Sequence, residues 1–179
     1  MLSTKRLYLR ESIETDVERF YEIYSDEKAK QYLEALSDDR EEEKEIIIAY
    51  KNMYHFYGYG MWTICLKDND RIIGRAGFEN FEMDGENVPE LGYVIDQEYR
   101  NKGLAYEICS AICEHAKEYM CVSRIICMIQ KDNEASIGLA LKLGFEKINP
   151  VRLNNHKRIQ NVENMTSQKK DIYLLQFHP

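Results

Sequence analysis

The alternation of apolar and polar positions near the start of the chain predicts a strand followed by a helix. Leu7 and Leu9 alternate with polar neighbours within residues 5–10, which is the period of a strand with one buried face. After a polar turn, the apolar residues recur at helical spacing. Thr15 and Glu18, three residues apart, form the sequence signature of a capping box, so we expect a helix to begin there.

The next elements predicted by the pattern are a second helix and a hairpin. The helix runs from about Asp39 to His55, and its acidic start suits the positive end of the helix dipole. We expect its EEEKE run to be a solvated face. Two strand-like runs, Met61–Leu66 and Arg71–Phe78, are joined by four polar turn residues and therefore predict a β-hairpin.

In the second half of the chain, helices and strands alternate. The predicted strands are Leu91–Ile95, Ile125–Ile129 and Asp171–Phe177, and the predicted helices end at about Met120 and at Leu143. A polar loop with Gly85 and Pro89 precedes the first of these strands. The strand, helix, strand order calls for a parallel crossover. Residues 149–170 are polar and have no clear period. We therefore expect an α/β (α+β) fold, with a mixed, mostly antiparallel, twisted sheet flanked by about four helices.

Length, composition and charge narrow the class of protein. A chain of 179 residues, 44% of them hydrophobic, suits one domain spanning residues 1–179. The net charge of -7 argues against nucleic acid as a partner, because phosphate binding needs basic residues concentrated on one face. No apolar run is long enough for a membrane span or a signal peptide. We expect a cytoplasmic protein without a membrane partner, as a monomer or a homodimer.

The five cysteines match neither a zinc-binding pattern nor a disulfide framework. They are Cys65, Cys109, Cys113, Cys121 and Cys127. Their spacings fit no zinc ribbon or finger, and an odd number fits poorly with paired bridges. We interpret them as small buried hydrophobic residues and expect no metal site, although Cys109 and Cys113 would share a helix face.

The loop between the strand at residues 91–95 and the following helix has the composition of an anion site. It contains Arg100, Asn101, Lys102, Gly103, Leu104 and Ala105. A strand-to-helix loop can aim several backbone N–H groups at one point, where the helix dipole is positive, and small residues let an anion approach closely. A basic helix start with a tightly packed glycine is the structural alternative. The loop is neither GxxxxGK[ST] nor GxGxxG, so it lacks the residues of a Walker or Rossmann nucleotide site.

Four segments together resemble the GNAT N-acetyltransferase superfamily, specifically its RimJ/RimL-like branch. They are KRLYLR, MWTICLKDNDRIIGRAGF, ELGYVIDQEYRNKGLAYE and NEASIGLALKLGFE, in this order along nearly the whole chain. The resemblance implies acetyl-CoA as cosubstrate, with its pyrophosphate bound by the loop of residues 100–105. It also implies that the strand of residues 92–95 splays from the strand of residues 125–129, forming a splayed central strand pair whose gap admits the pantetheine arm.

The resemblance also implies further contacts. The pantetheine amides would pair with the backbone of Val94 and Ile95, and Asn133 would hold the pantetheine or phosphate end. Ser136 and Lys142 would be weaker cofactor contacts. Each has a structural alternative: Asn133 can be only a helix N-cap, and Lys142 only a solvated helix residue.

Acetyl transfer requires a neutral amine, a polarised thioester carbonyl and a departing thiolate. A backbone N–H near Val94 would polarise the carbonyl. Glu90 is the candidate general base, with Glu79 and Asp96 as alternatives. Many GNAT proteins carry a tyrosine as proton donor where this chain has Ala140, and we consider Ser136 as a replacement donor.

The sequence therefore predicts transfer of an acetyl group from acetyl-CoA to a primary amine on a small molecule or protein: a protein N-terminus, a lysine or a small amine. Ala140 keeps a second hypothesis open, a non-catalytic CoA-binding sensor or assembly module. A third, an unrelated nucleotide enzyme, predicts competition by ATP or NAD, which this loop gives no reason to expect.

Overall fold

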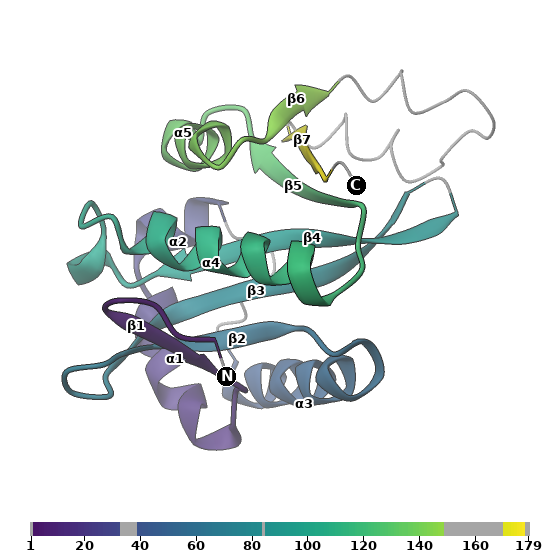
Figure 1. Ribbon diagram of the computed structural model, residues 1–179. Helices are drawn as coiled ribbons and strands as arrows, with labels where there is room; N and C mark the ends of the chain where they lie inside the picture. The colour runs from purple at the N-terminus through teal and green to yellow at the C-terminus, as the bar shows by residue number, and fades with distance from the viewer. Residues whose placement is uncertain (1, 33–38, 84, 149–169, 178–179) are drawn as a thin grey trace. The chain divides into compact units, whose positions relative to one another are not determined.

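The computed structural model describes residues 2–32, 39–83, 85–148 and 170–177 (Figure 1). The α-helices are α1 (Val17–Tyr24), α2 (Glu27–Tyr32), α3 (Arg40–Tyr57), α4 (Leu104–Tyr119) and α5 (Glu134–Lys142), with short 3-10 helices η1 (Glu14–Asp16) and η2 (Gln97–Tyr99). The strands are β1 (Leu7–Arg10), β2 (Met61–Leu66), β3 (Ile72–Met83), β4 (Glu86–Ile95), β5 (Arg124–Gln130), β6 (Glu146–Ile148) and β7 (Lys170–Gln176).

The strands form one mixed sheet with the order β1-β2-β3-β4-β5-β7-β6. The pairs β1/β2, β2/β3, β5/β7 and β6/β7 are antiparallel, whereas β4 pairs with β5 in parallel at Glu90 and Ile126. This confirms the predicted mixed α/β fold. Contacts divide the chain into unit 1, residues 1–78 and 92–114, and unit 2, residues 79–91 and 115–179. Each unit is described by itself below, and the single-domain organisation stays a prediction.

In unit 1, helices α1 and α3 supply the core that supports the end of β4. Phe20 and Ile47 are fully buried and cluster with Val17, Ile23, Tyr24 and Val94. Residues 17, 20 and 24 recur every three to four positions, so they form one apolar stripe on α1. Because Val94 belongs to the same cluster, its side chain packs the C-terminal end of β4 against these helices.

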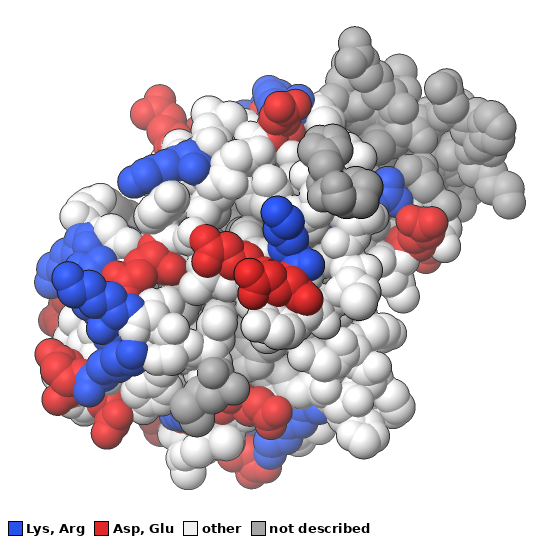
Figure 2. Space-filling model, viewed as in Figure 1, with Lys and Arg blue, Asp and Glu red and all other residues white. Residues whose placement is uncertain are grey.

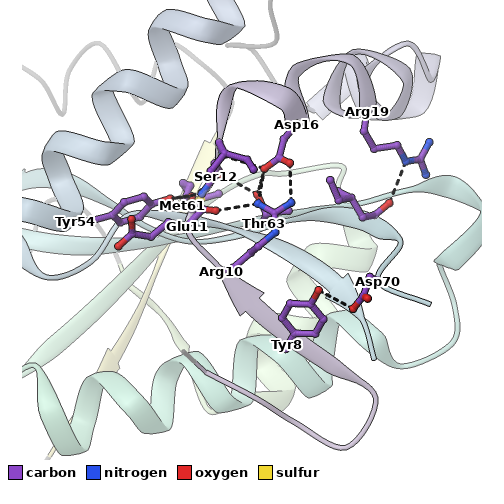
Figure 3. A network of polar contacts seen from close by, with 12 residues as sticks. Tyr8, Arg10, Glu11, Ser12, Asp16, Arg19, Tyr54, Met61, Thr63 and Asp70 are labelled. Atoms are coloured by element: carbon purple, nitrogen blue, oxygen red, sulfur yellow. Dashed lines mark hydrogen bonds and ion pairs between the residues drawn. The ribbon is translucent and has the colours of Figure 1, made fainter. Parts of the chain in front are cut away.

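A buried polar network joins β1, η1 and β2 in unit 1 (Figure 3). The Asp16 carboxylate accepts two hydrogen bonds of 2.7 Å from the Arg10 guanidinium, one of 3.0 Å from the Ile13 N–H and one of 3.0 Å from the Thr63 hydroxyl. Burial alone would raise the pKa of Asp16, but these donors hold the pKa below its usual value. Asp16 is also the N-cap residue of α1, so the predicted capping box of Thr15 and Glu18 is wrong.

A second buried ion pair corrects the expectation of a solvated EEEKE face. Glu43, inside that run, is buried on α3 and pairs with the buried Arg75 of β3. The Arg75 guanidinium lies 3.9 Å from the centre of the Phe20 ring. Burial raises the pKa of Glu43, while Arg75 acts in the opposite direction. The helical period alone could not show that the third acidic residue of the run faces a buried cation.

Unit 2 has a smaller core. It lies on β5, β6 and β7 and on the parts of β3 and β4 within residues 79–91. Met83, Val88, Ile126 and Ile172 are buried together in it. Strand β5 matches β7 along its full length, from Arg124 opposite Gln176 to Gln130 opposite Lys170.

Several predicted details differ from the structure. Strand β4 is longer than expected: it includes Pro89 and Glu90, whereas the predicted strand began at Leu91. The short elements α2 and β6 were not predicted, so the described residues contain five α-helices rather than about four. Cys65, Cys109, Cys113 and Cys127 are buried as expected, but Cys121 is exposed. Apart from Lys170, which begins β7, residues 149–170 lie outside the described part.

Within the described residues, no helix is both long and apolar enough to cross a bilayer.

Candidate active site

The predicted anion loop connects η2 to α4, within unit 1. Asn101 and Gly103 have φ angles of 59° and 75°, in the left-handed region, and Gly103 directly precedes α4. The first helical hydrogen bond of α4 runs from the Glu107 N–H to the Gly103 carbonyl, at 3.1 Å. The N–H groups of Leu104 and Ala105 precede this bond, so the helix provides no carbonyl four residues back for them. They lie at the positive end of a helix of 16 residues.

Two arginines fasten the loop to other parts of unit 1. The Arg100 Nε donates to the Ile95 carbonyl at 2.9 Å, and its Nη2 lies 2.7 Å from the Asp26 carboxylate. The Arg6 Nη1 donates to the Lys102 carbonyl at 3.0 Å. Figure 2 shows Lys and Arg side chains gathered where Figure 1 draws this loop, with Asp and Glu side chains beside them. Arg100 therefore organises the loop, and its guanidinium is engaged by protein oxygens.

The N-terminal segment is fastened to the first turn of α4 through Glu107. This carboxylate accepts hydrogen bonds from the Thr4 hydroxyl at 2.6 Å, the Arg6 N–H at 2.8 Å and the Arg6 Nε at 2.7 Å. Partial burial would raise the pKa of Glu107, but these donors hold the pKa below its usual value. This clamp of Arg6 and Glu107 was not predicted from the sequence. The sequence indicated only that Arg6 and Glu107 each lie in one of the segments that carry the family resemblance.

Helix α5, in unit 2, begins differently. The side chain of Asn133 accepts a hydrogen bond of 3.2 Å from the Ser136 N–H, which makes Asn133 the N-cap of the helix. The Asn133 carbonyl accepts the Ile137 N–H at 3.0 Å. Lys142 is exposed in the last turn, and Ala140 is buried. Asn133 therefore has a structural role as a helix cap, and its contact with the cofactor stays a prediction.

The side chains at the end of β4 are buried. Val94 and Ile95 are buried, and the Asp96 N–H donates to the Ile73 carbonyl at 2.8 Å. The Asp96 carboxylate pairs with Arg19 and accepts the Glu98 N–H at 3.0 Å. These two partners give Asp96 a structural role, and its alternative role as the base stays a prediction.

Glu90 has the ionisation expected of a general base near neutral pH. It is half-buried in the middle of β4, in unit 2. Burial, reinforced by the negative charge of Glu79, raises the pKa of Glu90 to about 7; Lys170 and a hydrogen bond with the Met128 backbone act in the opposite direction. A carboxylate with this pKa is half ionised at pH 7, so it can both accept and release a proton.

The candidate residues thus fall into two groups, each placed within its own unit. Unit 1 brings together the end of β4 and the anion loop: Val94, Ile95, Arg100, Asn101, Lys102, Gly103, Leu104 and Ala105. Unit 2 contains Glu90, Asn133, Ser136 and Lys142. Within the described part of the chain, no group of three or more His, Cys, Asp or Glu side chains is arranged to hold a metal ion.

Comparison with known proteins identifies the class of domain. Residues 6–146 match the acetyltransferase (GNAT) domain family. The chain is 31% identical over 146 residues to the uncharacterized N-acetyltransferase YnaD of Bacillus subtilis, and the aligned residues cover 82% of each chain. It is 34% identical over 80 residues to the Escherichia coli ribosomal protein uS5-alanine N-acetyltransferase, covering 45% of this chain and 41% of that one.

A solved structure shows the same fold. The ribosomal L7/L12 alpha-N-protein acetyltransferase RimL, in complex with coenzyme A, superposes with a TM-score of 0.75 and 19% identity, over 99% of this chain and 97% of that one. At this identity, the likeness shows the fold alone.

Proposed function

We propose, on the premise that this chain belongs to the GNAT acetyltransferase family, that it transfers the acetyl group of acetyl-CoA to the α-amino group of a protein N-terminus. The family membership makes the chain an acetyltransferase, and the identity of the acceptor is the proposed part. Two similar proteins carry names that refer to ribosomal proteins. One is a ribosomal protein uS5-alanine N-acetyltransferase, and the other is a ribosomal L7/L12 alpha-N-protein acetyltransferase. This proposal places the reaction in the cytoplasm, where ribosomal proteins are made.

The observation that carries the cofactor assignment is the backbone geometry of residues 100–105. Asn101 and Gly103 both take left-handed conformations at the start of α4. A Cβ atom added to Gly103 would meet only the Arg6 Nη2, at 3.7 Å, so the glycine has open space on that side. Open space, a positive helix end and two nearby cations, Arg6 and the exposed Lys102, suit a diphosphate. The residues present therefore fit the cofactor that the family uses.

The preference for an N-terminal amine has a free-energy basis. At pH 7, removing a proton from an α-amine with a pKa of about 7.7 to 8.0 costs about 1 to 1.4 kcal/mol, whereas a lysine with a pKa of about 10.4 costs roughly 4 to 5 kcal/mol. A carboxylate with a pKa of about 7, such as that of Glu90, suits the smaller of these tasks. We propose Glu90 as the general base that accepts a proton from the acceptor's ammonium group, directly or through water, and so produces the neutral amine that attacks.

In the proposed reaction, the neutral amine attacks the acetyl carbonyl carbon and the carbon–sulfur bond breaks. Backbone N–H groups at the end of β4 stabilise the negative charge that forms on the carbonyl oxygen. The thiol has a pKa of about 8.5, so it can leave as the anion even without the tyrosine that Ala140 replaces. Ser136 remains the candidate proton donor to the thiolate.

The second candidate, a non-catalytic CoA-binding module, is favoured by one observation: Ala140 is buried and has no ionisable group. Release of free thiol from acetyl-CoA, followed with a panel of acceptors, separates the two functions. We expect turnover with peptides that begin with alanine or serine. We expect much slower turnover with small amines. We also expect much slower turnover with lysine-containing versions of these peptides whose N-terminus is already acetylated, because only the lysine amine can then react. Acetyl-CoA binding without turnover on any acceptor would support the module instead.

The role of Glu90 predicts a specific pH dependence. In the wild type, kcat should rise as pH increases through about 7, because the base form of Glu90 exists above its pKa. Glu90→Gln should remove this rise and lower kcat at pH 7.5 by about 100-fold or more, with little change in acetyl-CoA affinity.

The matched control is Glu79→Gln, which removes the exposed charge that helps to raise the pKa of Glu90. This variant should stay active, and the rise in its pH–rate profile should move to lower pH. An unchanged profile in Glu90→Gln would remove Glu90 from the mechanism.

A further inference from the structure

Tyr99 lies beside the anion loop, and two cations lie over its ring. It is the last residue of η2, directly before the loop of residues 100–105, and it is half-buried. The Arg71 guanidinium carbon is 5.6 Å from the centre of the Tyr99 ring, and the Lys102 Nζ is 5.0 Å from it. Arg71 directly precedes β3, whereas Lys102 belongs to the loop itself. All three residues are in unit 1.

Both cations can exchange their present contacts for a ligand. The Arg71 Nη2 pairs with the Glu98 carboxylate at 3.1 Å, and the two side chains are 45% and 64% exposed. An ion pair this exposed contributes little to stability, because water and salt screen it. Lys102 is also exposed, and a cation–π contact at an exposed site is weak. The positive charges of Arg71 and Lys102 therefore remain available to an anion.

An aromatic ring with two cations matches a ligand that carries both an aromatic heterocycle and a phosphate group. A nucleobase stacks on a tyrosine ring, and a phosphate monoester pairs with guanidinium and ammonium groups. The adenosine end of acetyl-CoA has adenine and a phosphate at the ribose 3′ position. Only the ribose separates this end from the diphosphate, and Tyr99 directly precedes the loop proposed to bind that diphosphate. The pantetheine arm carries neither group.

We infer that Arg71, Tyr99 and Lys102 form a subsite for the 3′-phosphoadenosine of the acetyl donor. Tyr99 stacks on the adenine, Arg71 binds the 3′-phosphate, and Lys102 contributes the second positive charge. This inference rests on the proposed function and deepens it. The subsite makes the protein select acetyl-CoA over acetyl donors that consist of phosphopantetheine alone.

The first test compares calorimetric affinities for CoA and for 3′-dephospho-CoA, which differ only in the 3′-phosphate. The wild type should bind CoA about 30-fold more tightly than 3′-dephospho-CoA. Arg71→Gln should reduce this ratio to about threefold or less, and its affinity for 3′-dephospho-CoA should equal that of the wild type. Equal wild-type affinities for the two ligands, or an unchanged ratio in Arg71→Gln, would overturn the inference.

The matched control is Arg124→Gln. Arg124 also pairs with an exposed glutamate, Glu86, at 3.0 Å, so this variant removes the same charge and the same kind of ion pair. It should keep the wild-type ratio of the two affinities. A ratio lowered as much as in Arg71→Gln would overturn the inference, because the effect would then come from the total charge of the protein.

Tyr99→Leu tests the stacking separately. The affinities for CoA and for 3′-dephospho-CoA should each fall by about 10-fold, since both ligands carry adenine. The affinity for 4′-phosphopantetheine, which has no adenosine, should not change. Equal losses for all three ligands would overturn the inference, because Tyr99 would then only support the loop.

Phosphorus NMR of CoA bound to the wild-type protein requires no variant. Binding should lower the pKa of the 3′-phosphate from its usual value of about 6, because two adjacent cations favour the doubly charged form. An unchanged pKa in bound CoA would overturn the inference. Failure of the wild type to bind CoA at all is a different result, because it would refute the cofactor assignment on which the proposed function rests.

Discussion

Helices α4 and α5 begin with contrasting solutions to the same problem, the first-turn N–H groups that a helix cannot satisfy internally. At the start of α5, the Asn133 side chain accepts the Ser136 N–H. At the start of α4, the preceding residue is Gly103, which has no side chain to act as a cap. The charged residues around it, Arg6 and Arg100, bind carbonyl groups of the adjoining backbone instead.

This difference separates a capped helix start from one that is predicted to bind a ligand. A capped start such as that of α5 stabilises the protein without an external partner. The start of α4 combines left-handed loop residues and open space beside Gly103 with the side-chain contacts of Arg6, Arg100 and Glu107. We propose that these features preserve the shape of the loop for an anion from solution.

The largest expected effect is that of Gly103→Glu, which introduces bulk and negative charge at the start of α4. We expect acetyl-CoA affinity to fall by about 100-fold or more, since a carboxylate would repel the diphosphate at the position that should bind it. Isothermal calorimetry on the folded variant measures this change.

The control is Gly58→Glu. Gly58, the C-cap of α3, has a φ angle of 74° and open space, so the same substitution carries similar backbone strain. It should lower stability by about 1 kcal/mol and leave affinity for acetyl-CoA unchanged. Equal affinities in the two variants would refute the placement of the diphosphate.

A smaller effect is expected from Glu107→Gln, which weakens the clamp between the N-terminal segment and α4. The loss of charge-assisted hydrogen bonds from Arg6 should reduce the free energy of unfolding by about 2 kcal/mol and acetyl-CoA affinity by several-fold. Chemical denaturation and calorimetry measure the two effects.

Because the pKa of Glu107 is lowered in the folded protein, its stabilising contribution is present above the unfolded pKa and is lost as pH falls through the folded pKa. The stability difference between wild type and Glu107→Gln should therefore shrink at acidic pH. As a control, Glu98→Gln removes a carboxylate whose ion pair with Arg71 is exposed, and it should change stability by less than about 1 kcal/mol. A pH-independent difference for Glu107→Gln would contradict the role assigned to its charge.

The smallest effect is expected at the start of α5. Asn133→Ala removes the cap and should reduce the free energy of unfolding by about 1 kcal/mol, whereas Asn133→Ser should retain most of it because serine also caps helices. Thermal unfolding distinguishes these variants. If Asn133 also contacts the cofactor, both should bind acetyl-CoA more weakly despite their different stabilities. An unchanged affinity in Asn133→Ser would leave Asn133 with its capping role alone.

Local patterns predicted much of the fold. The polar turn between Leu66 and Ile72 and the acidic start of α3 at Asp39 were interpreted correctly, since neighbouring residues determine turns and helix caps. The loop of residues 100–105 was correctly located directly before a helix, and its binding of an anion stays a prediction. The short elements α2 and β6 were missed because each contains too few residues to establish a period.

The sequence by itself determined the order of the main elements, the mixed character of the sheet and the family, because all three depend on periodicity and on motifs read along the chain. Only the tertiary structure decided which polar residues are buried and what they contact. Arg6 and Glu107 are 101 positions apart, Glu43 and Arg75 are 32 apart, and Gly74 meets Val94 across two strands. Such pairings follow from packing in three dimensions, where the cost of burying a charge or the space for a Cβ atom depends on residues distant in the sequence.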